Sequence, residues 1–124
     1  MSTKQIALIT GAERGIGAAA AIELARQKIK VVVNYLSDHK SAERVVQEIK
    51  SNGGEAFKLQ ADVCDVEQVT RMTNQIIERW GTIDILVSNA NIPFVIKPFL
   101  DISWSELSQK LNNEIQAAFL LTQA

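Results

Sequence analysis

The chain has 124 residues, of which 47% are hydrophobic and 22% charged, and its formal net charge at pH 7 is -1. These values fit one soluble domain and give no surplus of basic residues for binding nucleic acid. No stretch has the pattern of a signal peptide or a membrane-spanning helix, so we expect a cytoplasmic protein that does not bind a membrane. One cysteine rules out an intrachain disulfide, and a single histidine argues against a metal site.

The first predicted strand is the apolar run 6–9, and an alanine-rich segment with helical spacing follows it. Between them lies Thr10-Gly11-Ala12-Glu13-Arg14-Gly15-Ile16-Gly17. Gly11 permits a tight turn, Gly15 lets the backbone approach a pyrophosphate, and Gly17 allows close packing of helix on strand. Free N–H groups at the helix start favour an anion. The segment therefore predicts a dinucleotide phosphate site, and the alternative is a tight turn without a ligand.

Strands and helices alternate along the middle of the chain. Residues 29–35 and 56–59 are predicted strands, and residues 38–51 form a helix between them that ends at Asn52-Gly53-Gly54. The next helix begins after Asp65, and Gly81 ends it. Its apolar positions near one face are Val66, Val69, Met72, Ile76 and Trp80.

Residues 83–87 form the fourth predicted strand, and a loop with two prolines follows. Ser103 and Glu106 have capping-box spacing at the start of a last helix. The apolar stripe of this helix, which needs a covering surface, comprises Trp104, Leu107, Leu111, Ile115, Ala118 and Thr122. The alternation of elements predicts an α/β fold in which helices connect parallel strands.

Together these motifs resemble the short-chain dehydrogenase/reductase family, and within it the 3-oxoacyl-acyl-carrier-protein reductase type. The resemblance covers nearly the whole chain. It rests on the glycine motif, Asp62-Val63, residues 83–87 leading into Asn89-Ala90, and Trp104 with the segment 118–124. It implies a Rossmann-type doubly wound parallel sheet of order 3-2-1-4. Residues 1–124 would then be an NAD(P)-binding Rossmann domain that lacks the carboxyl-terminal strands and helices.

The resemblance implies that a nicotinamide dinucleotide is the ligand. Asp62 would bond the adenine ring with Val63 against it, and Asn89-Ala90 would form the floor beneath the adenosine ribose. The alternatives are that Asp62 caps a local turn and that Asn89 joins neighbouring strands. Asn91 stands where the family usually has glycine. The predicted cofactor-binding residues are Gly11, Glu13, Arg14, Gly15, Ile16, Gly17, Asn34, Tyr35, Ser37, Asp62, Val63, Asn89 and Ala90.

The end of the second strand decides the expected cofactor. An acidic residue there would bond the ribose hydroxyls of NAD and repel the extra phosphate of NADP. The chain has Asn34-Tyr35-Leu36-Ser37 instead. Arg14 stands beside Gly15, where a guanidinium can hold a phosphate through two hydrogen bonds, and Ser37 can donate another. We expect NADP(H) in preference to NAD(H), with Asp38 as a solvated turn residue.

Catalysis in the family implies a serine and a tyrosine followed four residues later by a lysine. The only tyrosine, Tyr35, lies in the second predicted strand. Glu114 aligns with the family's helix asparagine, so the candidate relay positions are Glu114 and, with a shifted helix, Asn113; the alternative is a surface glutamate. We expect a NADPH-dependent oxidoreductase for a carbonyl or alcohol, with this chain supplying the cofactor half and inactive alone.

Two open surfaces predict association. The fourth strand would be an exposed edge, and the last helix would show its apolar stripe. We expect a homo-oligomer, either a dimer or a tetramer, or pairing with a complementing chain. The alternative function is a non-catalytic nucleotide-binding or assembly module that needs a partner chain. A serine and a Tyr-x-x-x-Lys sequence encoded downstream would favour the enzyme.

Overall fold

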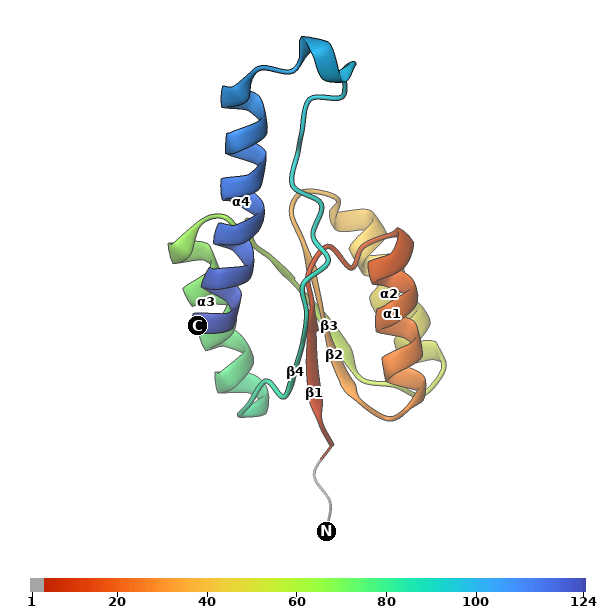
Figure 1. Ribbon diagram of the computed structural model, residues 1–124. Helices are drawn as coiled ribbons and strands as arrows, with labels where there is room; N and C mark the ends of the chain where they lie inside the picture. Colours follow the sequence, from red (N-terminus) through yellow and green to blue (C-terminus); the bar gives the residue numbers. More distant parts are fainter. Residues whose placement is uncertain (1–3) are drawn as a thin grey trace.

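The computed structural model describes residues 4–124 and has one parallel sheet between two layers of helices (Figure 1). The order of the strands is β3-β2-β1-β4, and Leu8 of β1 is in register with both Val32 and Leu86. The strands are β1 (Ile6–Ile9), β2 (Lys30–Tyr35), β3 (Ala56–Gln60) and β4 (Ile85–Val87). The Rossmann-type order predicted from the sequence is confirmed.

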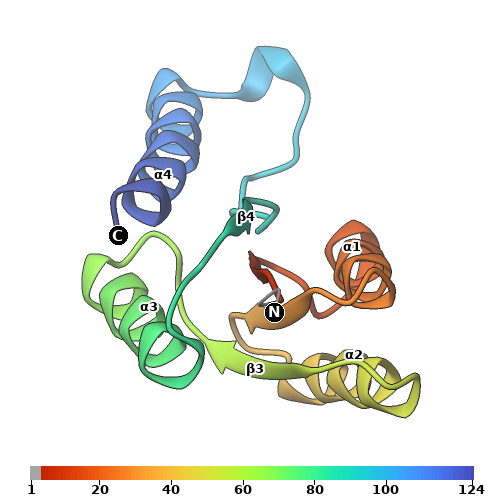
Figure 2. The same cartoon turned by 90° about the horizontal axis from the view of Figure 1, so that it is seen from below.

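Each face of the sheet is covered by a pair of helices (Figure 2). One pair is α1 (Gly15–Arg26) and α2 (His39–Ser51), and the other is α3 (Val66–Trp80) and α4 (Trp104–Gln123). A short 3-10 turn, Phe99–Asp101, precedes α4. Because both faces are covered, side chains on both sides of β1 and β2 are buried, and two hydrophobic cores form.

Side-chain caps fix where three of the helices begin. Asp65 accepts hydrogen bonds from the backbone N–H groups of Glu67 and Gln68 at the start of α3, and Gly81 ends that helix in the left-handed conformation. Ser103 and Glu106 form the predicted capping box of α4. Asp38 caps α2, so this helix begins one residue later than predicted.

The fourth strand is shorter than the sequence predicts. Residues 83–87 were the expected range, but β4 begins at Ile85. The reason lies in Asp84, whose Oδ2 accepts a hydrogen bond from the Ile6 N–H at 2.9 Å. The Asp84 N–H also donates to the Ile6 carbonyl at 2.8 Å. A carboxylate therefore takes the place of a strand carbonyl, and regular pairing starts after it.

Two helix faces also differ from their predictions. Val66 is 56% exposed because it lies on the first turn of α3, outside the core. The buried residues of α4 are Ala117 and Leu121, which contact the core on a face other than the predicted stripe. The stripe itself stays largely open, with Trp104 75% and Ile115 68% exposed. The stripe is therefore open, and the expectation that another surface covers it stays a prediction.

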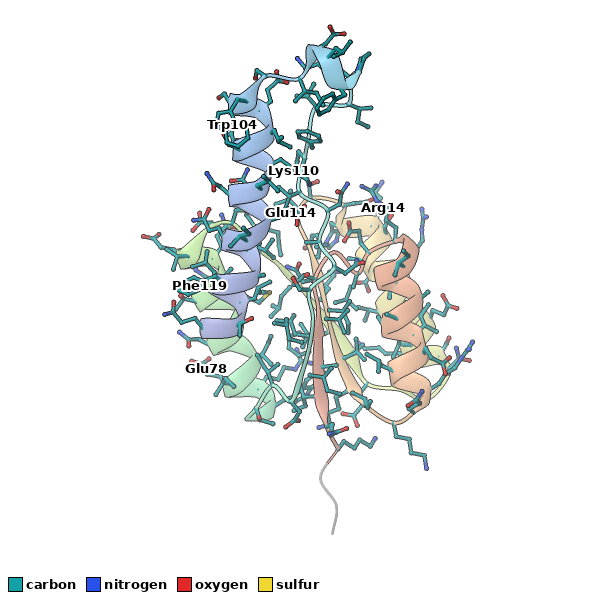
Figure 3. The ribbon with its side chains drawn as sticks, viewed as in Figure 1. Arg14, Glu78, Trp104, Lys110, Glu114 and Phe119 are labelled. Carbon is teal, nitrogen blue, oxygen red and sulfur yellow. The ribbon has the colours of Figure 1, made fainter. Side chains whose placement is uncertain are left out.

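The outer side of α4 and one edge of β4 are both open in the part of the chain that the structure describes. Figure 3 shows Trp104 and Phe119 on this outer side. Within the part of the chain that the structure describes, β4 pairs with β1 alone and its other edge has no strand beside it. No helix in residues 4–124 is long and apolar enough to cross a membrane.

Candidate cofactor site

The site lies at the carboxyl ends of β1 and β4, where the order of the strands reverses. The loops after these strands approach so closely that only glycine fits. A Cβ on Gly11 would lie 2.7 Å from the Ala90 Cα, and one on Gly17 would lie 2.4 Å from the Gly11 carbonyl oxygen. Gly11 also has a φ of +61°, a backbone conformation that residues with a side chain rarely adopt. Reversal points of this kind are where open α/β sheets bind ligands.

A network of hydrogen bonds joins the two loops. The Thr10 hydroxyl accepts from the backbone N–H groups of Asn89 and Ala90 at 2.9 and 3.0 Å. The Asn89 side-chain amide donates to the carbonyl oxygens of Thr10 and Gly11, both at 3.2 Å. These bonds fix the glycine loop against the loop after β4. Asn89 thus performs the joining role that the sequence analysis kept as an alternative to a cofactor contact.

Asn34 holds the same loop from the other side. Its side-chain oxygen accepts from the Gly11 N–H at 3.2 Å, and its amide nitrogen donates to the carbonyl oxygens of Leu59 and Ala61 at 3.3 Å. The residue is only 2% exposed. Its side chain is enclosed, already paired and positions Gly11, and the predicted contact of Asn34 with the cofactor stays a prediction.

The start of α1 is open to an anion. Arg14 is its N-cap residue, no side chain caps the helix, and its first turn contains no acidic residue. Gly15 has a φ of +61°, and a Cβ built on it would meet no atom within 4 Å. A phosphate can therefore approach the backbone N–H groups of this turn without displacing a side chain. Ile16, also predicted in the site, is 82% exposed on the same turn.

Glu13 contributes a polar group without a partner. Its Oε2 atom is buried and makes no hydrogen bond with any residue that the structure describes. A buried carboxylate oxygen in this state is costly, and a hydroxyl or amide donor relieves the cost. The donor-rich ribose of a dinucleotide is a ligand of the right chemistry. Two features of the glycine loop therefore fit such a cofactor: the open space at Gly15 and the unpaired oxygen of Glu13.

Asp62 and Val63 follow β3 at the same end of the sheet. The Asp62 side chain accepts from the Cys64 N–H at 2.9 Å, which is the local turn considered as its alternative role. Only its Oδ1 atom takes part in that bond. Val63 is 6% exposed and belongs to the core. Val63 therefore packs beneath the site, and its predicted position against the adenine ring stays a prediction.

The comparisons with known proteins agree with this geometry. The family model of the short chain dehydrogenases matches residues 5–124. The chain belongs to the short-chain dehydrogenase family. A versicolorin reductase of Emericella nidulans is 52% identical over 88 residues, which are 71% of this chain and 33% of that protein. A 3-oxoacyl-[acyl-carrier-protein] reductase of Staphylococcus aureus is 42% identical over 92 residues, 74% of this chain and 37% of that protein.

Solved structures of short-chain dehydrogenases share the fold. A dehydrogenase/reductase from Sinorhizobium meliloti superposes with a TM-score of 0.88 at 31% identity, covering 98% of this chain and 48% of that one. A metagenomic short-chain oxidoreductase in complex with NADP gives a TM-score of 0.84 at 30% identity, covering 97% and 54%. The chain thus spans about a third to a half of the length of these relatives.

Two pairs of oppositely charged residues lie near the carboxyl ends of the strands, one on each side of the sheet. Arg14 lies on the α1 side, and its Nη1 atom is 4.0 Å from the Asp38 Oδ2 (Figure 3). Ser37 is exposed beside them, while Tyr35 is partly buried with its hydroxyl 3.5 Å from the His39 ring. Asp38 was expected to be solvated, and its contact with Arg14 was missed because the two residues are far apart in sequence.

Lys110 and Glu114 lie on the α4 side (Figure 3). The Lys110 Nζ donates to the Ile92 carbonyl at 2.6 Å and pairs with the Glu114 carboxylate. Glu114 pairs with this lysine and remains exposed, so the structure is compatible with the alternative of a surface glutamate. The Asn113 carbonyl faces the Cys64 Sγ at 3.7 Å. The lysine was missed at the sequence level, since a single Lys on a helix carries no motif.

Cys64 packs partly buried between these elements. Burial raises the pKa of its thiol, and the charges of Asp62 and Glu114 act in the same direction. A thiol with a raised pKa is a poor nucleophile at neutral pH, which fits a packing role for Cys64.

A hollow of about 600 Å³ lies elsewhere, at the free edge of β3 between α2 and α3. The Lys58–Glu43 ion pair lines it, and the Arg79 guanidinium lies 4.1 Å from the Phe57 ring centre. Charged side chains of this kind protect a sheet edge from pairing. The hollow contains no glycine turn and no helix N-terminus among its lining residues, so it is not the cofactor site.

Proposed function

We propose that this chain binds NADP(H) at its glycine loop and is the cofactor-binding half of an oxidoreductase that exchanges a hydride between nicotinamide and a carbonyl or alcohol. The observation that carries the proposal is the start of α1, uncapped by any side chain and open at Gly15. A pyrophosphate fits there because the backbone N–H groups and the helix dipole both favour an anion.

Each group in the site has a definite task in this proposal. The turn at Gly15 and Ile16 holds the pyrophosphate, while Thr10 and Asn89 keep the two loops in place for it. Asp62 has a carboxylate oxygen for the adenine ring. Glu13 accepts from a ribose hydroxyl, and Ala90 lies beneath that ribose. When bound, NADPH supplies the hydride.

Arg14 and Ser37 set the preference for NADP(H). Both side chains are exposed, with that of Arg14 76% exposed. Arg14 precedes α1 and Ser37 follows β2, and the 2′-phosphate of the adenosine is proposed to bind beside them. A guanidinium gives this phosphate charge-assisted hydrogen bonds. The relative solved with NADP shares this half of the fold. A cytoplasmic location, expected from the sequence, belongs to the same proposal.

The direction proposed is reduction of a carbonyl, as in relatives named versicolorin reductase and 3-oxoacyl-[acyl-carrier-protein] reductase. The serine and the Tyr-x-x-x-Lys that would bind and protonate the carbonyl are not among these 124 residues. Glu114, held by Lys110, is the proposed relay position, with Asn113 as the alternative. The proposal therefore separates binding, which this chain performs, from turnover, which needs those further groups.

The test is a titration followed by an assay. The purified chain is expected to enhance and shift NADPH fluorescence on binding, because the nucleotide moves from water to a protein surface. The same sample, mixed with NADPH and a 3-oxoacyl thioester, is expected to show no loss of absorbance of the reduced cofactor. A chain that binds neither NADPH nor NADH would contradict the proposed function. Turnover by a homogeneous sample would contradict the division between binding and chemistry.

We also propose that the chain associates through the outer side of α4, as a homo-oligomer or with a complementing chain. Trp104, Leu111, Ile115 and Phe119 are each about half exposed or more. Burial of an apolar side chain contributes about 1.5–3 kcal/mol, so several of them give a strong drive to associate. If the chain associates but binds no dinucleotide, the alternative of an assembly module is favoured.

Light scattering tests this association. The unmodified chain is expected to have a mass of at least twice 13.7 kDa, and Ile115→Asp is expected to reduce it to one chain, because a charge would be buried at the contact. Val66→Asp is the matched control, since Val66 is comparably exposed but belongs to α3 and not to the outer side of α4. A monomeric unmodified chain would overturn the proposal, as would an equal effect of both substitutions.

A further inference from the structure

A carboxylate stands beside the cation that is proposed to bind the 2′-phosphate. The Asp38 Oδ2 lies 4.0 Å from the Arg14 Nη1, although 24 residues separate the two in sequence. Asp38 is anchored by two hydrogen bonds, from the Ser41 N–H at 3.1 Å and from the Ser41 hydroxyl at 2.7 Å. Arg14 has only this loose contact and a side chain that is 76% exposed.

The anchored partner is also the ionised one. The hydrogen bonds from Ser41 hold the pKa of Asp38 below its usual value, and the charges of Arg14 and Arg44 lower it further. Asp38 is therefore negative throughout the neutral pH range. Because its position is fixed by its role as the cap of α2, a ligand cannot readily push it away.

We propose that Asp38 opposes the binding of a 2′-phosphate at Arg14 and so limits the preference of this chain for NADP(H) over NAD(H). The inference rests on the proposed function, since it concerns the cofactor held at that site. It follows from the anchored carboxylate and the exposed, loosely paired guanidinium. A phosphate that takes Arg14 must replace an existing ion pair and accept a fixed negative charge close by.

The size of the effect follows from the charges. A dianionic phosphate and a carboxylate that share one guanidinium at the surface repel each other appreciably in water, and salt screens part of this. Removing the carboxylate charge is expected to tighten NADPH binding about three- to tenfold. NADH has no 2′-phosphate and carries its charge at the pyrophosphate, so its affinity is expected to change less than about twofold.

The experiment compares NADPH and NADH binding by the unmodified chain and by Asp38→Asn. Asparagine is as good a helix cap as aspartate, so α2 keeps its start while the negative charge is removed. Asp38→Ser, a second capping residue without charge, guards against an effect specific to asparagine. Asp65→Asn is the matched control, because Asp65 also caps a helix through backbone N–H groups but belongs to α3 on the other face of the sheet.

A selective gain in NADPH affinity for both Asp38 variants, absent in Asp65→Asn, supports the inference. Unchanged ratios of the two affinities in the Asp38 variants would overturn it while leaving the proposed function intact. So would an equal gain in Asp65→Asn, which would show a general effect of net charge. If the unmodified chain binds neither dinucleotide, the proposed function fails and the inference fails with it.

Discussion

Arg14→Ala is expected to weaken the binding of NADPH about ten- to a hundredfold and the binding of NADH less than about threefold. The reason is the loss of charge-assisted hydrogen bonds to a 2′-phosphate, which contribute about 1.5–3 kcal/mol. NADH has no phosphate at that position and keeps its contacts with the α1 turn. Fluorescence titration of both dinucleotides measures the difference.

Two further variants make this result specific. Arg14→Lys keeps the charge but loses the planar fork of donors, so an intermediate loss for NADPH is expected. Arg26→Ala removes an exposed arginine from the other end of α1, where it pairs with Glu23, and is expected to change neither affinity. Equal losses for NADPH and NADH in Arg14→Ala would contradict the assignment of Arg14 to the 2′-phosphate.

Gly15→Ala is expected to weaken NADPH and NADH alike, by about tenfold or more. The added methyl group would stand in the open space at the start of α1, where we propose that the pyrophosphate binds. Loss of one hydrogen bond to a charged ligand at this point costs about 1.5–3 kcal/mol, equally for both dinucleotides. The same titrations measure it, and the pattern differs from the selective effect expected at Arg14.

Gly53→Ala is the matched control for the backbone. Gly53 also has a positive φ, +86°, and a Cβ built on it would meet no atom within 4 Å. It lies in the turn after the C-terminal end of α2, outside the candidate site. Both substitutions are expected to lower the free energy of unfolding by about 1–2 kcal/mol, the cost of a left-handed L residue. If Gly15→Ala binds both dinucleotides as well as Gly53→Ala does, the cradle is not at Gly15.

Local signals in the sequence predicted the strands and helices, and the family resemblance predicted the order of the strands. Buried apolar runs gave the strands, and the capping residues Asp65 and Ser103 marked helix starts that the structure confirms. The glycine pattern located the turn between β1 and α1. These features depend on neighbours a few residues apart, so a linear pattern contains them.

The features that escaped prediction depend on long-range contacts. Asn34 is enclosed by backbone groups from two other segments, and nothing in its neighbours in the sequence shows that. Asp84 was counted in a strand because the apolar run around it is continuous, yet its side chain bonds Ile6. The inner face of α4, Ala117 and Leu121, was hidden by a more apolar stripe on the outer side. The Arg14–Asp38 contact joins two loops and has no local signature.

The most direct test of the central claim is a map of amide chemical shifts in an isotope-labelled sample of the chain titrated with NADPH. We expect the largest changes at residues 11–17, with others at Asp62 and Ala90. We expect little change at the free edge of β3, where the hollow of about 600 Å³ lies. Changes confined to that hollow, or none at the glycine loop, would contradict the proposal that this loop binds a nicotinamide dinucleotide.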